Sequence, residues 1–231
     1  MFERFAQRSH ELEHLDTGDY TAEEYAKWLD EMKLINRWLG DAKALRLALE
    51  QEPSLAAATS LSVLDIGAGS GELLRTAHDM LDGRARIFVG SELNITAARA
   101  INERRSEFGV VGLLCNGLQL PFADNSFDIV MCSLLLHHLT NDQAVRLIAE
   151  MDRVARRLFI VIDLFRDPLP YFLYRVLSPL FLQRKSVEDG SLSILRSFRS
   201  EELRELADRA GVANPSVRRA AFRLILTGSK Q

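Results

Sequence analysis

The residues of this sequence best suited to proton transfer are two adjacent histidines and an aspartate. His137 and His138 follow one apolar segment, and Asp163 ends a later one. An imidazole titrates near neutral pH, so it can take a proton from a hydroxyl group. A neighbouring aspartate can orient the ring and stabilise its charged form. We therefore expect His137 or His138 to act as a catalytic base held by Asp163. Alternatively, one histidine packs in the core and Asp163 only stabilises its loop.

A glycine-rich stretch at residues 63–74, VLDIGAGSGELL, has the pattern of a ligand-binding turn. Gly67, Gly69 and Gly71 alternate with small residues directly after an apolar segment that contains Asp65. Without a Cβ, glycine lets the backbone turn sharply and approach a ligand closely. The helix expected next offers unpaired N–H groups and the positive end of its dipole. The stretch predicts a site for an anion or a polar cofactor, and a purely structural turn is the alternative.

An acidic residue, Glu92, ends the next apolar segment. A carboxylate at the end of the second strand of an open parallel sheet can accept both ribose hydroxyls of an adenosine. Glu92 is therefore a candidate cofactor ligand, and the alternative is a solvated loop glutamate.

The rest of the chain indicates how these residues come together. From residue 61, apolar runs of strand length alternate with helical segments, which is typical of a parallel sheet wrapped by helices. The last two strands have almost no connection and should pair antiparallel at one edge. Ligands bind beyond the carboxyl ends of parallel strands, where the glycines, Glu92 and the histidines would lie. Expected strands are 62–66, 86–90, 110–115, 127–133, 158–163, 216–221 and 223–228, and expected helices are 72–81, 95–108, 142–155 and 200–210.

Two parts lie outside this alternation. Residues 1–53 are interpreted as a helical cap, with a capping box at residues 21–24, in front of a domain of residues 54–231. Residues 164–199 form an insertion that we interpret as a lid, with an apolar stretch and then a polar loop, KSVEDGSLS. Aromatic residues of both parts are expected to form a roof over an apolar, flat substrate: Tyr20, Tyr25, Trp28, Trp38, Phe165, Tyr171, Phe172 and Tyr174.

Four segments between residues 63 and 139 resemble, in order, the motifs of class I S-adenosylmethionine (SAM) dependent methyltransferases. They are the glycine turn with Asp65, the acid Glu92, the stretch CNGLQLPFADNSFD at residues 115–128, and FDIVMCSLLLHHL at residues 127–139. The resemblance is closest to the small-molecule branch that includes ubiquinone and menaquinone biosynthesis methyltransferases (methyltransferase type 11). It implies a Rossmann-like fold and SAM as cofactor. The implied cofactor-binding residues are Asp65, Gly67, Ala68, Gly69, Gly71, Glu92, Leu93, Asn116, Gly117, Leu118, Cys132 and Ser133.

The expected fold is therefore a Rossmann-like, doubly wound, mostly parallel seven-stranded sheet with an antiparallel C-terminal strand pair. The expected function is methyl transfer from SAM to a small, aromatic or quinone-like hydroxyl acceptor. Two alternatives stay open. Asn116 stands where the family usually has aspartate, which leaves room for a non-methylating scaffold or regulator that binds SAM. An NAD(P)-dependent oxidoreductase is disfavoured, because the glycine spacing is G-x-G-x-G and not G-x-G-x-x-G.

The composition of the chain narrows the classes of partner that the protein is expected to bind. The net charge is −3, so the basic surface typical of nucleic-acid binding is absent. The start has no apolar signal-peptide core, and no segment reaches the roughly 18 apolar residues of a membrane span. We expect a cytoplasmic protein. Cys115 and Cys132 lack metal-ligand spacing, so we expect free thiols and no metal.

Residues 171–184 are apolar with an embedded Arg175, so they could contact a membrane surface. Burial as a lid explains the same pattern and is the favoured interpretation. The sequence indicates no particular oligomeric state.

Overall fold

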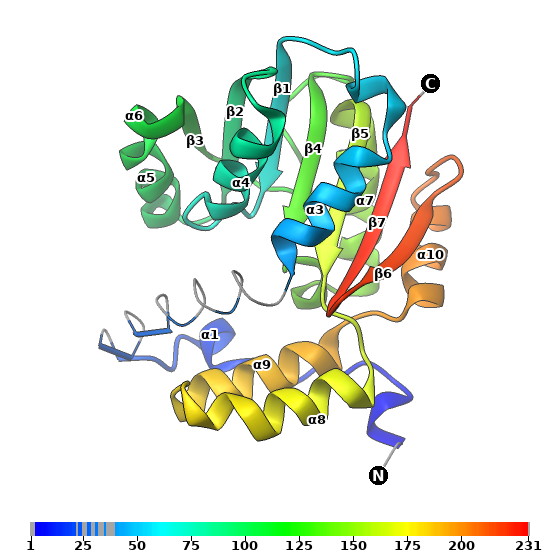
Figure 1. Ribbon diagram of the computed structural model, residues 1–231. Helices are drawn as coiled ribbons and strands as arrows, with labels where there is room; N and C mark the ends of the chain where they lie inside the picture. The colour runs from blue at the N-terminus through cyan, green and yellow to red at the C-terminus, as the bar shows by residue number, and fades with distance from the viewer. Residues whose placement is uncertain are drawn as a thin grey trace.

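A seven-stranded sheet organises the fold, as seen in a computed structural model that describes residues 3–21, 23–24, 27–28, 31, 35 and 40–230. The strand order is β3-β2-β1-β4-β5-β7-β6 (Figure 1). β1 to β5 run parallel, and β7 runs antiparallel to β5 and β6. The predicted fold class is confirmed. The strands are β1 Leu61–Ile66, β2 Ala85–Glu92, β3 Val110–Leu114, β4 Phe127–Ser133, β5 Ala155–Asp163, β6 Ser216–Ala220 and β7 Arg223–Ser229.

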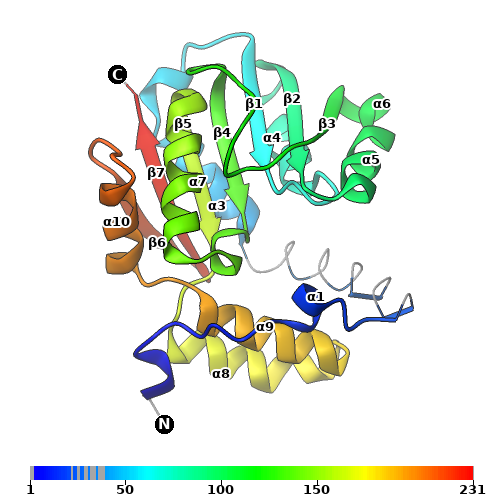
Figure 2. The ribbon, with the colours of Figure 1, turned by 180° about the vertical axis from the view of Figure 1, so that it is seen from behind.

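Helices cover both faces of this sheet. α3 Asp41–Glu50, α4 Glu72–Leu81 and α5 Ile95–Glu103 pack on one face, and α7 Asn141–Val154 and α10 Ser200–Arg209 pack on the other (Figures 1 and 2). Every residue of β1 is buried. Apolar side chains are needed on both sides of a strand that is covered on both sides, which is why the strand segments read as apolar runs.

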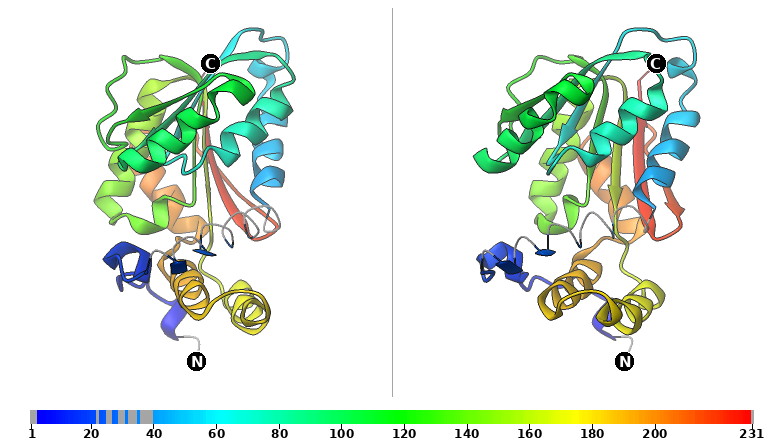
Figure 3. Two further views of the ribbon diagram at one scale, coloured as in Figure 1. Left: turned by 90° about the vertical axis from the view of Figure 1, so that its left-hand side faces the viewer. Right: turned by 60° about the vertical axis from the view of Figure 1, so that its left-hand side comes forward.

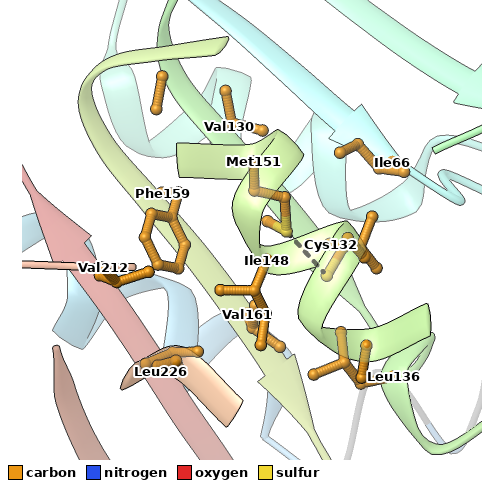
Figure 4. Packing of buried hydrophobic residues seen from close by; sticks show 14 of the residues in the cluster. Ile66, Val130, Cys132, Leu136, Ile148, Met151, Phe159, Val161, Val212 and Leu226 are labelled. Carbon is orange, nitrogen blue, oxygen red and sulfur yellow. Dashed lines mark hydrogen bonds between the residues drawn. The ribbon is translucent and has the colours of Figure 1, made fainter. Parts of the chain in front are cut away.

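The core between α7 and the sheet contains one of the two cysteines. Met151 and Ile148 of α7 pack with Val161 of β5 and Cys132 of β4 (Figure 4). The Cys132 Sγ lies 3.7 Å from the Met151 Sδ. Cys115 and Cys132 are both free. Because β2 and β1 separate β3 from β4, a disulfide between them is out of reach, and the prediction of free thiols is confirmed.

The helix expected over residues 95–108 is divided. α5 ends at Glu103, and a short α6, Arg105–Phe108, follows. The Asn102 side chain donates to the Gly112 carbonyl oxygen at 2.9 Å and accepts the Gly112 N–H at 3.0 Å. This pair of bonds ties the end of α5 to β3, next to the break.

The insertion after β5 is a helical hairpin. It consists of α8 Pro168–Leu177, a 3₁₀ turn η4 Ser178–Leu180 and α9 Arg184–Arg196. The prediction of a polar loop at residues 185–193 is wrong, because that stretch lies within α9. The hydroxyls of Ser191 and Ser193 bond to carbonyl oxygens one turn back, as Ser193 Oγ does with the Asp189 oxygen at 3.0 Å.

Polar residues of α9 are buried against the N-terminal part of the chain. The Asp189 carboxylate accepts the backbone N–H groups of His14 and Leu15 at 2.8 and 3.2 Å, at the start of α1, His14–Thr17. Gly190 allows the two hairpin helices to approach, since a Cβ there would lie 2.2 Å from the Tyr174 hydroxyl oxygen. The polar composition of α9 thus reflects contact with other polar groups and not with solvent.

The N-terminal residues are divided between two places. α3 packs on the sheet, while η1 Glu3–Phe5 and α1 lie with α8 and α9 in a layer beyond the carboxyl ends of β1, β4 and β5 (Figures 1 and 3). The expected capping box is confirmed by bonds from Thr21 N to Glu24 Oε2 and from Glu24 N to Thr21 Oγ1. Tyr25 and Trp38 lie outside the described residues. In the part of the chain that the structure describes, no helix is long and apolar enough to cross a membrane.

Candidate cofactor and catalytic site

The glycine turn between β1 and α4 has the expected geometry. Gly67, Gly69 and Gly71 have φ angles of 70°, 56° and 79°, which favour glycine. The N–H groups of Gly67 and Ala68 donate to the Ser91 carbonyl oxygen at 2.9 and 3.3 Å, which fixes the turn against the end of β2. A Cβ on Gly69 would meet no heavy atom within 4 Å, so the space beside the turn is open.

Two acids lie beside this turn. Glu92 Oε1 accepts the Gly69 N–H at 2.5 Å, and burial raises the pKa of Glu92 despite that bond. Asp65 is buried, and its Oδ1 has no hydrogen-bond partner among the described residues. Burial, and then the charge of Glu92, raise the pKa of Asp65 well above its usual range. The turn therefore favours a ligand that brings donors or positive charge.

The loop after β3 contains three further residues that are expected to bind the cofactor, Asn116, Gly117 and Leu118. Asn116 is exposed, and its Oδ1 accepts the Leu118 N–H at 2.9 Å. Gly117 packs tightly on β1, because a Cβ there would lie 2.6 Å from the Ile66 Cγ2. Leu118 packs against the core. Leu93, at the end of β2, is exposed.

The end of β4 has unpartnered polar atoms and an unusual backbone. Ser133 Oγ and, on β2, Ser91 Oγ are buried without a hydrogen-bond partner among the described residues. Leu134 has φ 53°, a left-handed conformation that costs on the order of 1–2 kcal/mol in a non-glycine residue. Strained backbone of this kind often occurs at functional sites. The Cys132 side chain points into the core and lies against Met151.

The predicted pairing of a histidine with Asp163 is present, and the histidine is His137. His137 Nδ1 lies 2.7 Å from Asp163 Oδ1, and the His137 backbone N–H donates to Oδ2 at 3.0 Å. Both side chains are buried. Burial alone would lower the pKa of His137, but the charges of Asp163 and then of Glu13 outweigh burial and raise this pKa. Burial alone would raise the pKa of Asp163, but the charge of His137 outweighs burial and lowers this pKa.

His138 has a different environment. Its Nδ1 lies 3.2 Å from Asp16 Oδ1, and its side chain is a quarter exposed. Burial, and then the charge of His137, lower the pKa of His138 to about 4, although Asp16 opposes them. At neutral pH, His138 is therefore a neutral and weakly basic ring.

Three charged residues near the histidines were not predicted, because they come from distant parts of the chain. Glu13 and Asp16 belong to the N-terminal part, and Arg196 ends α9. Arg196 Nη1 lies 3.3 Å from Glu13 Oε1 and forms an ion pair with Asp16. No local pattern distinguishes these residues from ordinary surface charges.

Glu13, His137 and His138 each offer a ligand atom, and these atoms lie within 4.8 Å of one another. Glu13 Oε1 also accepts a bond from Ser193 Oγ at 2.8 Å, and Arg196 balances its charge. We assign no metal to this cluster, and the expected lack of one stays a prediction.

The expected aromatic roof is only partly formed. Tyr171 packs edge-on against Phe5 with ring centroids 5.3 Å apart, inside the hairpin layer. The Tyr174 hydroxyl donates to the Ser186 carbonyl oxygen at 2.9 Å, and Phe165 lies in the core. These rings pack within the hairpin layer or, for Phe165, in the core beside the sheet, so their presence does not indicate the acceptor.

Comparison with known proteins finds similarity over the part of the chain that contains the glycine turn, Glu92 and the two histidines. Residues 63–157 match a family model described as a methyltransferase domain. Over this segment the chain is therefore similar to methyltransferase domains. The ubiquinone/menaquinone biosynthesis C-methyltransferase UbiE of Burkholderia vietnamiensis is 35% identical over 96 residues, which cover 41% of this chain and 38% of that relative. The matched part is thus less than half of either protein.

The fold of this chain resembles solved structures of methyltransferases over more of its length. A SAM dependent methyltransferase from Aquifex aeolicus has a TM-score of 0.56 at 16% identity, over 81% of this chain and 97% of that one. Magnesium protoporphyrin IX methyltransferase from Synechocystis PCC 6803, solved with bound SAH, has a TM-score of 0.55 at 18% identity, over 82% of this chain and 81% of that one. At these identities the likeness shows the fold.

The segment that matches the family model has free polar groups where a cofactor is expected. Asp65 Oδ1 and Ser133 Oγ are buried and unpartnered among the described residues, and buried polar atoms usually have a partner. The space beside Gly69 is open. These features fit a polar cofactor at the carboxyl edge of β1, β2 and β4.

Proposed function

We propose that the chain transfers a methyl group from SAM to a small hydroxylated acceptor, with His137 as the general base and Asp163 as its positioning residue. The observation that carries this proposal is the buried His137–Asp163 pair at the same sheet edge as the glycine turn and Glu92. SAM supplies a methyl group on a positively charged sulfonium. The acceptor still has to lose a proton, which is the task assigned to His137.

The acids and the glycine spacing at the turn support SAM over a dinucleotide. Glu92 accepts the Gly69 N–H, and Asp65 is near enough for the charge of Glu92 to raise its pKa. SAM brings a sulfonium and an ammonium group that carboxyl groups can bind, and the spacing G-x-G-x-G differs from the G-x-G-x-x-G of dinucleotide sites. We assign Glu92 to the ribose hydroxyls, as the resemblance implies, and Asn116, Gly117 and Leu118 to the adenine side.

The hydrogen bonds of His137 support its role as the base. With the Nδ1 proton donated to Asp163, the Nε2 position remains to accept a proton. Glu13 helps to raise the pKa of His137 and lies in the layer that covers it. An acceptor that moves Glu13 aside would weaken this effect, and the neutral ring needed in a base would become more populated.

We propose an aromatic or quinone-like acceptor with an ionisable hydroxyl. The relative from Burkholderia is named as a C-methyltransferase of ubiquinone and menaquinone biosynthesis. Removal of a phenolic proton spreads negative charge over the oxygen and the ring carbons. The same base would therefore serve methylation at oxygen or at carbon.

Calorimetry with SAM, its demethylated product and NADH, followed by methyl-transfer assays with phenols and hydroquinones, tests the proposal. We expect binding of SAM and its product, no binding of NADH, and transfer that depends on His137. Binding of NADH alone would indicate an oxidoreductase. Binding of SAM without transfer to any hydroxylated aromatic would favour a non-methylating SAM-binding protein.

A further inference from the structure

The outer surface of the helical hairpin is a continuous apolar face made by α8 and η4. Val176 is 70% exposed and Leu180 is 79% exposed. The other large apolar side chains that are exposed on this segment are Leu169, Phe172, Leu173, Leu177 and Phe181. The buried-lid interpretation of residues 171–184 therefore fails for the outward side chains. We call these seven residues the apolar face.

Helical periodicity separates this face from the packed side of α8. Pro170 and Tyr171 are buried, and Tyr174 binds α9 through its hydroxyl. The exposed residues lie between these positions at helical spacing, on the opposite side. Packing within the described part of the chain thus uses mainly one side of α8. On the apolar face, only the edge residue Phe172 has a described ring contact with another element, with its centroid 6.2 Å from that of Phe5. Exposed apolar patches of this kind mark interaction sites.

The charges around the apolar face are basic. Residues 168–187 contain Arg175, Arg184 and Lys185 and no acidic residue, in a chain whose net charge is −3. Arg175 is exposed and forms no ion pair with any described residue. Arg4, also exposed, lies over the Tyr171 ring at 4.8 Å from its centroid. Arg184 is paired with Glu188 and Lys185 with Glu24, so Arg175 carries the unpaired charge of this segment.

We propose that the apolar face docks the protein onto an anionic lipid surface. An amphipathic helix with exposed leucine and phenylalanine residues and flanking arginines binds the boundary between head groups and acyl chains. Anionic lipids attract Arg175. The acids that border the segment, Asp167 and Glu188, each lie near an arginine, Arg219 at 3.9 Å and Arg184 at 2.8 Å. α8 lies at the end of the molecule away from the C-terminus, where a flat surface can reach it (Figures 1 and 3). This docking does not depend on the proposed reaction.

Flotation of the full chain with phosphatidylcholine vesicles, with and without phosphatidylglycerol, tests the proposal. We expect binding to the vesicles that contain phosphatidylglycerol and weaker binding at high salt. Val176→Glu combined with Leu180→Glu should lower the bound fraction about tenfold. Ile87→Glu, at a 54% exposed apolar residue of β2, should leave binding unchanged.

Arg175→Glu should weaken binding to the anionic vesicles, while Arg99→Glu, at an exposed arginine of α5, should not. Circular dichroism and SAM binding should match the unmodified protein in every variant, which shows that the variants fold. Failure of the unmodified protein to float would overturn the proposal, as would undiminished flotation of the double glutamate variant. A concentration-dependent dimer that the double variant abolishes, without vesicle binding, would instead assign the face to a second copy.

Discussion

Asp163 accepts two hydrogen bonds from His137, one from the ring Nδ1 at 2.7 Å and one from the backbone N–H at 3.0 Å. The carboxylate thereby fixes both the position and the orientation of the ring. Such a pair distinguishes His137 from its neighbour His138, whose ring contacts Asp16 at a more exposed position. A general base must keep one nitrogen free, and this arrangement leaves the Nε2 of His137.

Replacement of His137 by alanine should therefore lower turnover by about 10²–10⁴-fold, the usual contribution of a general base. SAM affinity should be nearly unchanged, because the glycine turn and Glu92 are untouched. Asp163→Asn should lower turnover in the same direction, since it disturbs the tautomer and charge of the ring. Turnover and calorimetry on the same preparations measure the two effects.

His138→Ala is the matched control, because it removes an adjacent imidazole without the Asp163 contact. It should keep most of the turnover. Equal losses in the His137 and His138 variants would contradict the assignment of the base. Near-normal turnover in both would indicate that catalysis here relies on positioning.

Glu92→Ala should weaken SAM binding by about 2–3 kcal/mol, as expected when charge-assisted hydrogen bonds are lost. Glu107→Ala, at a partly exposed acid of α6, controls for the change in net charge and should leave SAM affinity unchanged. Unaltered SAM affinity in a folded Glu92 variant would remove this residue from the site.

Gly69→Ala tests the turn itself. Gly69 has φ 56° and Gly109 has φ 73°, and an added Cβ meets no heavy atom within 4 Å at either position. Both variants should lose about 1–2 kcal/mol of unfolding free energy from backbone strain alone. We expect only Gly69→Ala to weaken SAM binding as well, because a ligand approaches that backbone. A parallel loss of SAM affinity in Gly109→Ala would attribute the effect to general destabilisation.

His138 should make the protein less stable in acid. Its pKa is lowered from 6.5 to about 4 in the folded state, so the unfolded chain binds the proton more readily. Its contribution to stability is present above pH 6.5 and is lost as the pH falls toward about 4. The full loss is about 3 kcal/mol, from 1.36 kcal/mol per pKa unit.

Urea unfolding of the His138→Gln variant, near neutral pH and at about pH 4.5, checks this expectation. The variant should lose less unfolding free energy on acidification than the unmodified protein. His10→Gln, at an exposed histidine, should behave like the unmodified protein. An unchanged pH dependence in the His138 variant would show that other groups control acid stability.

The sequence by itself determined the sheet, the glycine turn and the meeting of a histidine with Asp163, but not which of the two histidines it is. These features depend on local patterns: apolar runs of strand length, glycines that permit positive φ, and residues placed at strand ends. In a parallel sheet, the strand ends meet at one edge, so residues distant in the chain become neighbours without further information.

Only the tertiary structure decided what surrounds that edge. Ser193 and Asp189 suggested a solvated loop but lie buried in α9, where backbone and side-chain partners satisfy them. Glu13 and Arg196 meet near His137, although neither has a local sequence signal. Val176 was expected to be buried and is exposed. Whether a side chain meets solvent or another group depends on contacts between distant segments, and local periodicity does not specify those contacts.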